Sequence, residues 1–251
     1  MAEPFLNEKE QIKQALKEIK FKIAVHSGKG GVGKTFFSIN LAYLLKDLGY
    51  AVGILDADVD CPNIPKHLKV DTHMTAHGNN LVPVSVDGIK IASTAFLNDP
   101  ADPDAPIIVR GPIKHRLLMD FLTRTEWGKL DFLIFDLPPG TSDVPLSTMQ
   151  IGNLDGIILV TTPTSEAILD TKRSGKMAQT MNARIVGLVE NMSGEVFGEG
   201  KALELAKDLH IEFLGSIPLK KEHRELSEKG KPALLKSESA KNLVKKIIEL
   251  L

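Results

Sequence analysis

Short apolar runs alternate with amphipathic stretches along most of the chain. Runs such as residues 132–135 and 157–160 have the length and composition of strands buried on both faces of a parallel sheet. The stretches between them repeat apolar positions every three or four residues, as helices that cover such a sheet do. We expect strands over residues 21–26, 51–56, 89–93, 131–136, 156–161, 184–190 and 213–217, and helices over residues 7–19, 34–48, 113–125, 144–151, 166–181, 200–209, 221–228 and 239–250.

This order of elements predicts the fold class. Repeated strand–helix units without a break in composition favour one α/β domain over residues 1–251. Its core would be a single doubly wound, mostly parallel sheet with helices on both faces. Residues 71–87 and 98–106 are expected to be the largest surface loops, and the pattern leaves open whether they form a recognition surface.

Composition and charge narrow the class of protein. Lys and Arg number 31 against 32 Asp and Glu, and the resulting net charge of −1 argues against general binding to nucleic acid or anionic membranes. The N-terminus lacks the pattern of a signal peptide, and no apolar run approaches the roughly 20 residues of a membrane span. The single cysteine, Cys61, cannot form an internal disulfide, so we expect a cytoplasmic protein.

The clearest motif is G-x-x-x-x-G-K-[ST] over residues 28–35, between an expected strand and an expected helix. Its glycines let successive backbone N–H groups turn toward one anion, and the helix N-terminus adds its positive dipole end. The motif predicts a nucleotide site. We assign nucleotide contacts to Gly28, Lys29, Gly30, Gly31, Val32, Gly33, Lys34, Thr35 and the following Phe36.

Acidic residues follow two of the expected strands, where a P-loop enzyme needs them. Lys34 would reach the β- and γ-phosphates, and the Thr35 hydroxyl would ligate Mg²⁺. We assign Asp56 and Asp136 to the water shell of the same ion, because Mg²⁺ dehydrates reluctantly. Asp58 is the candidate for orienting the attacking water.

Lys29, directly after the first glycine, is typical of the deviant Walker A subgroup, in which this lysine reaches the partner's nucleotide across a dimer interface. Such a lysine would neutralise charge on the transferring phosphoryl group, as an arginine finger does. Hydrolysis would then depend on dimerisation.

Further segments carry a family resemblance over about residues 23–232. They include Asp56-Ala-Asp58, Asp136-Leu-Pro-Pro-Gly-Thr-Ser-Asp143, Val189-Glu-Asn-Met-Ser193 and Leu214-Gly-Ser-Ile-Pro-Leu219. Together with the P-loop, they resemble the Mrp/ApbC-type ATPases, the iron–sulfur cluster carrier branch of the MinD/ParA group. The resemblance implies a homodimer that sandwiches two ATP molecules, with Asn191 and the Pro218 loop near the adenine. An alternative for Asn191 is that it only caps a strand end.

The chain departs from the carrier pattern at one place. Carriers have a Cys-x-x-Cys loop before the Phe-Gly-x-Gly segment, whereas here that loop is reduced to Gly194-Glu195-Val196. A [4Fe–4S] cluster normally takes four cysteines, and a dimer of this chain supplies two. The usual bridging cluster is therefore not expected. Cys61 is either a small loop residue or a ligand in a cluster completed by external thiols.

Three functions compete. The favoured one is a slow, dimer-dependent Mg-ATP hydrolase of Mrp type, acting in or near iron–sulfur cluster assembly or transfer, with a cysteine-bearing client or scaffold as a further partner. The first alternative is a MinD/ParA-like positioning ATPase. The second is a nucleotide-gated binding module without hydrolysis, against which the intact Lys29, Lys34 and Asp58 argue.

The C-terminal stretch over residues 241–251 is basic and amphipathic. We expect it to form a helix that packs on the sheet, with membrane binding as the alternative.

Overall fold

The computed structural model describes residues 3–97 and 111–251 of the chain. The strands are β1 (Ile19–His26), β2 (Val52–Asp56), β3 (Thr75–His77), β4 (Asn80–Val82), β5 (Val84–Val86), β6 (Ile89–Ser93), β7 (Leu130–Asp136), β8 (Gly156–Thr161), β9 (Ile185–Ser193) and β10 (Phe213–Pro218). The helices are α1 (Glu3–Ala15), α2 (Lys34–Asp47), α3 (Ile64–His67), α4 (Gly111–Arg124), α5 (Asp143–Ile151), α6 (Ser165–Thr180), α7 (Lys201–Asp208), α8 (Lys221–Glu228) and α9 (Glu238–Glu249), with a 3₁₀ turn, η1 (Thr94–Leu97).

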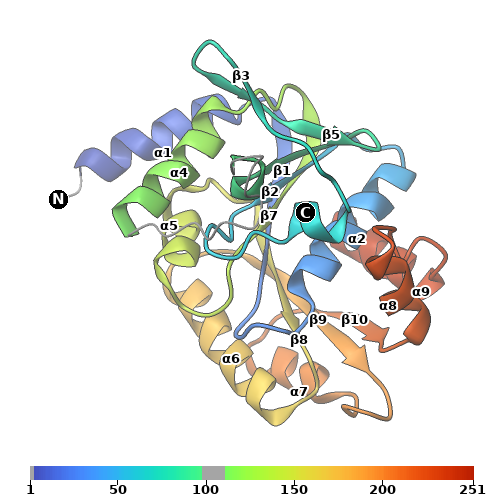
Figure 1. Ribbon diagram of the computed structural model, residues 1–251. Coiled ribbons are helices and arrows are strands. Elements are labelled where there is room, and N and C mark those ends of the chain that lie inside the picture. The colour runs from blue at the N-terminus through green and yellow to red at the C-terminus, as the bar shows by residue number, and fades with distance from the viewer. Residues whose placement is uncertain (1–2, 98–110) are drawn as a thin grey trace.

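An eight-stranded sheet in the order β10-β9-β8-β1-β7-β2-β6-β5 forms the centre of the molecule (Figure 1). Its pairings are parallel except at the edge, where β5 runs antiparallel to β6. The doubly wound, mostly parallel fold class predicted from the sequence is confirmed.

Side chains of the strands alternate between two buried clusters, one on each face of the sheet. On β1, Ile23 and Val25 belong to one cluster and Ala24 to the other. Helices α2 and α9 cover the first face, and α1, α4, α5 and α7 cover the second (Figure 1). The C-terminal helix α9 buries its apolar side chains in the first cluster, which confirms that its amphipathic stretch packs on the sheet.

Two expectations are corrected. The first helix ends at Ala15 and Ile19 already belongs to β1, because that side chain is buried in the core beneath α1. Residues 71–87 are not a plain loop, since they contain the hairpin β3–β4 and the edge strand β5. The loop expected over residues 98–106 lies outside the described residues. Within the described ranges, no helix is long and apolar enough to cross a membrane.

Strand order and register bring the site together. β1 lies between β7 and β8. The connection that leaves β1 leads to β2 on one side of it, whereas the connection that leaves β7 leads to β8 on its other side, so the carboxyl ends of β1 and β7 flank a topological switch point. Asp56 and Asp136 are register partners on β2 and β7, and Asp56 and Ser93 are partners on β2 and β6. Three polar side chains from strands far apart in sequence therefore lie at one level of the sheet edge.

Candidate nucleotide site

The glycine-rich loop leaves β1 and enters α2 with two close approaches that exclude larger residues. A Cβ on Gly28 would lie 2.1 Å from the carbonyl carbon of Asp170, because the loop passes directly over the backbone of α6. Gly33 has a φ of +84°, and a Cβ there would lie 2.1 Å from Nδ2 of Asn191. These positions require glycine for space as well as for conformation.

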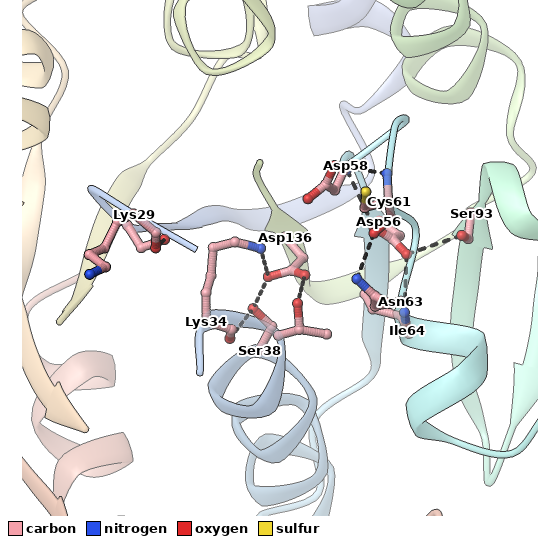
Figure 2. Close-up of polar contacts among 12 residues, drawn as sticks. Lys29, Lys34, Ser38, Asp56, Asp58, Cys61, Asn63, Ile64, Ser93 and Asp136 are labelled. Carbon is pink, nitrogen blue, oxygen red and sulfur yellow. Dashed lines mark hydrogen bonds and ion pairs between the residues drawn. The ribbon is translucent and has the colours of Figure 1, made fainter. Parts of the chain in front are cut away.

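Three side chains of the first two turns of α2 converge on Asp136 (Figure 2). The Lys34 Nζ lies 2.9 Å from Asp136 Oδ1, and the Thr35 hydroxyl donates to Oδ2 at 2.7 Å. The Ser38 hydroxyl donates to Oδ1 at 2.6 Å. Lys34 and Asp136 are both buried, so this polar cluster is shielded from solvent and its interactions are correspondingly strong.

Asp56 is the second buried carboxylate of the site. Its Oδ2 accepts hydrogen bonds from the Ser93 hydroxyl at 3.1 Å and from the Ile64 backbone N–H at 3.2 Å. Burial, and then the charge of Asp136, raise the pKa of Asp56 to about 7. Two buried carboxylates that repel one another form a donor set suited to a divalent cation.

The loop that follows Asp56 carries Asp58 and Cys61 (Figure 2). The Cys61 backbone N–H donates to Asp58 Oδ1 at 3.2 Å, and the Asn63 amide donates to the Cys61 carbonyl at 2.7 Å. Burial raises the pKa of Asp58, although the charge of Lys34 opposes the shift. Asp58 and the exposed Cys61 both line the cavity described below.

Lys29 is directed away from Asp136 (Figure 2). Its Nζ lies 3.2 Å from Oε2 of Glu166, at the start of α6, and the two side chains are 38% and 84% exposed. An ion pair this exposed contributes little to the free energy of folding, so Lys29 can leave Glu166 for another partner at little cost.

Asn191 lies inside β9 rather than at its end, which rules out the role of a strand cap. Its Nδ2 donates to the Val32 carbonyl at 2.8 Å and so ties the P-loop to β9. A cavity of about 790 Å³ opens above these residues, and Asn191, Pro218, Phe36 and the P-loop line it. The cavity has a volume typical of small-ligand sites.

Sequence reasoning missed four residues of this region. Ser38 and Ser93 donate hydrogen bonds to the two buried carboxylates, Glu166 pairs with Lys29, and His223 lines the cavity. Only Ser38 carried a local signal, because it lies four residues after Lys34 and hence on the same face of α2.

His26 at the end of β1 is fully buried. Burial, with a smaller contribution from the charge of Lys34, lowers the pKa of His26 to about 4, so its ring is neutral at neutral pH. His26 is therefore part of the packed floor beneath the P-loop.

Residues 18–251 match the family described as ParA: NUBPL iron-transfer P-loop NTPase. The chain belongs to this family. It is 44% identical over 256 residues to an iron-sulfur cluster carrier protein of Methanocaldococcus jannaschii. The alignment covers 95% of this chain and 88% of the relative. A carrier protein of Saccharolobus solfataricus is 40% identical over 259 residues, covering 96% and 87%. The branch predicted from the motifs is thus confirmed.

Solved structures agree on the fold of this family member. A nucleotide-binding protein of Archaeoglobus fulgidus in complex with ADP superimposes with a TM-score of 0.77 at 35% identity, covering 92% of this chain and 95% of the other. The cell division ATPase MinD of Pyrococcus furiosus gives a TM-score of 0.69 at 23% identity, covering 93% and 100%. At 23% identity, the similarity to MinD shows only that the fold is shared.

Proposed function

We propose that this chain is a slow, homodimerising Mg-ATPase that acts in iron–sulfur cluster assembly or transfer. The observation that carries the proposal is the convergence of Lys34, Thr35 and Ser38 on the buried Asp136 at the mouth of the P-loop. The relatives named as iron-sulfur cluster carriers and the ADP-bound relative support the same reading.

The residues present fit a magnesium ion. Within residues 3–97 and 111–251, no three His, Cys, Asp or Glu side chains form a group that could hold a metal by themselves. A cation here would therefore take most of its ligands from water and phosphate, as Mg²⁺ prefers. Thr35 would ligate it, and Asp56 and Asp136 would hold its water shell. When bound, the ion supplies positive charge to the phosphate oxygens.

The remaining steps fall to this chain's own side chains. The P-loop N–H groups and Lys34 would bind the phosphates and neutralise their charge. Asp58 would orient the attacking water, and its raised pKa makes it a better proton acceptor than an ordinary carboxylate. Lys29 would leave Glu166 and reach the nucleotide of the second protomer, which makes turnover depend on dimerisation.

Binding of an iron–sulfur cluster would require a partner protein. Because the chain has one cysteine, a homodimer offers two thiolates where a [4Fe–4S] cluster normally takes four. We propose that a cysteine-bearing client or scaffold supplies the rest, with Cys61 as the contribution of this chain. Cys61 is suited to that contact because it is exposed beside Asp58 and would respond to the nucleotide state.

The proposal is tested by measuring Mg-ATP binding, hydrolysis and molecular mass on the full-length chain. Lys34→Ala should abolish nucleotide binding, and Asp58→Ala should bind ATP, stop hydrolysis and accumulate as a dimer. Retention of tight binding by Lys34→Ala, or a monomeric Asp58→Ala variant at saturating Mg-ATP, would contradict the proposal.

The cluster is tested separately by anaerobic reconstitution with iron and sulfide, with and without a thiol-bearing scaffold. Visible absorbance and iron content that depend on Cys61 would support cluster handling. Iron binding that is identical in Cys61→Ala would remove Cys61 from the site.

A further inference from the structure

The cavity extends past the phosphate loop to a second wall that the triphosphate does not use. This wall is built by Phe36 in the first turn of α2, by Pro218 at the end of β10 and the following Leu219, and by His223 in the first turn of α8. The P-loop and Asp58 line the same cavity, so a nucleotide whose phosphates occupy the P-loop has this wall available for its base.

Phe36 and His223 form a pair of rings on this wall. Their centroids are 6.1 Å apart with an interplanar angle of 32°, and only 9% of His223 is exposed. A ring held by packing on an aromatic neighbour presents its polar edge in a fixed direction. His223 is therefore positioned in the way that a recognition residue requires.

The surroundings of the His223 ring favour one tautomer. The nearby backbone of Pro218 has no N–H and can offer the ring only its carbonyl oxygen, which favours the tautomer whose N–H faces that oxygen. Burial and then Lys220 lower the pKa of His223, while Glu222 and the Pro218 carbonyl oppose that shift. In a neutral imidazole with one nitrogen donating, the other nitrogen is an acceptor only.

We propose that His223 selects the base, its free ring nitrogen accepting a hydrogen bond from the exocyclic amine of adenine while Phe36 packs beside it. Adenine carries an amine donor at its 6-position, whereas guanine and hypoxanthine carry an oxygen acceptor there. Two acceptors facing one another repel, so the site would reject 6-oxopurine nucleotides. This inference rests on the proposed function, because the nucleotide must occupy this cavity.

The test measures dissociation constants of Mg-ATP and Mg-ITP, which differ in the group at the 6-position, by titration calorimetry at pH 7.5. The wild-type chain should bind ATP about tenfold more tightly than ITP. His223→Phe keeps a ring against Phe36 but removes the acceptor, so ATP binding should weaken while ITP binding, relieved of the repulsion, should strengthen. The roughly tenfold ratio of the two dissociation constants should then fall to about one. His223→Gln restores an acceptor and should recover part of the preference.

His67→Phe is the matched control, because His67 also lines the cavity but belongs to α3. It should leave the ratio of the two constants unchanged. An equal loss of ATP and ITP binding in His223→Phe would assign His223 a packing role and overturn the inference, as would an unaltered ratio. A wild-type chain that binds both nucleotides equally would defeat this inference alone, whereas one that binds neither would defeat the proposed function.

Discussion

Asp56 and Asp136 are register partners on the neighbouring parallel strands β2 and β7, and both are 1% exposed. The register brings two carboxylates together where desolvation already disfavours their charge. Lys34 offsets the charge of Asp136 directly, at 2.9 Å. Asp56 forms no ion pair among the described residues; it accepts hydrogen bonds, and the charge of Lys34 opposes the rise in its pKa only in part. Without a bound cation, the negative charge of the site is therefore not fully neutralised. Burying an ionised Asp56 there lowers the free energy of unfolding, and a bound cation would offset this cost.

This cost gives a prediction for Asp56→Asn. The folded chain holds the Asp56 proton more tightly than the unfolded chain, because the folded pKa is raised from 3.8 to about 7. The contribution of Asp56 to the free energy of unfolding is therefore largest at low pH and falls as pH rises through 7. Relative to wild type, Asp56→Asn should gain about 2–3 kcal/mol between pH 5 and pH 8 in urea unfolding. A difference that does not change with pH would show that Asp56 is not strained.

His26 makes an opposite contribution over the same pH range. Its folded pKa is lowered from 6.5 to about 4, so the unfolded chain takes up the proton first and stability is lost as pH falls below 6.5. His26→Gln should cancel this loss, gaining about 2 kcal/mol relative to wild type between pH 8 and pH 5. Since the two groups oppose one another, the wild-type profile is flattened, and only the two variants separate them. Parallel profiles for His26→Gln and wild type would contradict the burial argument.

Ser38→Ala tests the hydrogen bond to Asp136. The variant leaves a buried, charged acceptor with one donor fewer, which should lower the free energy of unfolding by about 1–3 kcal/mol and weaken Mg-ATP binding several-fold. Ser174→Ala is the matched control: Ser174 is equally buried, but its hydroxyl has no hydrogen-bond partner among the described residues. Ser174→Ala should therefore be neutral or stabilising, and equal losses in the two variants would count against a specific role for Ser38.

Lys29→Ala tests transfer of this lysine to a second protomer. Because Lys29 lies outside the Asp136 cluster, its loss should leave the dissociation constant of Mg-ATP nearly unchanged and lower kcat by roughly 100-fold. Glu166→Gln removes the present partner of Lys29 while keeping the lysine, and kcat should then be unchanged or higher. Full turnover by Lys29→Ala would remove the cross-dimer role, and equal impairment of both variants would point to the Lys29–Glu166 pair instead.

Individual strands and helices could be predicted from the sequence because each depends mainly on the residues of its own segment. The apolar runs that became β6 and β8 have the predicted bounds, since each run is bounded by polar or turn residues in the chain itself. The P-loop was also readable, because its function needs consecutive residues at one strand–helix junction. The short strands β3, β4 and β5 escaped prediction, since three-residue segments carry too little periodicity to distinguish a strand from a turn.

The sequence by itself determined the alternation of strands and helices, the phosphate-binding loop, the acidic residues at strand ends and the single cysteine. Only the tertiary structure decided which of these side chains meet. Strand order made partners of Asp56 and Asp136, 80 residues apart in the chain, and it placed Lys29 against Glu166 and His223 against Phe36. Such contacts follow from the register of β2 with β7 and from how α6 and α8 pack, which depend on the whole core at once rather than on any short segment.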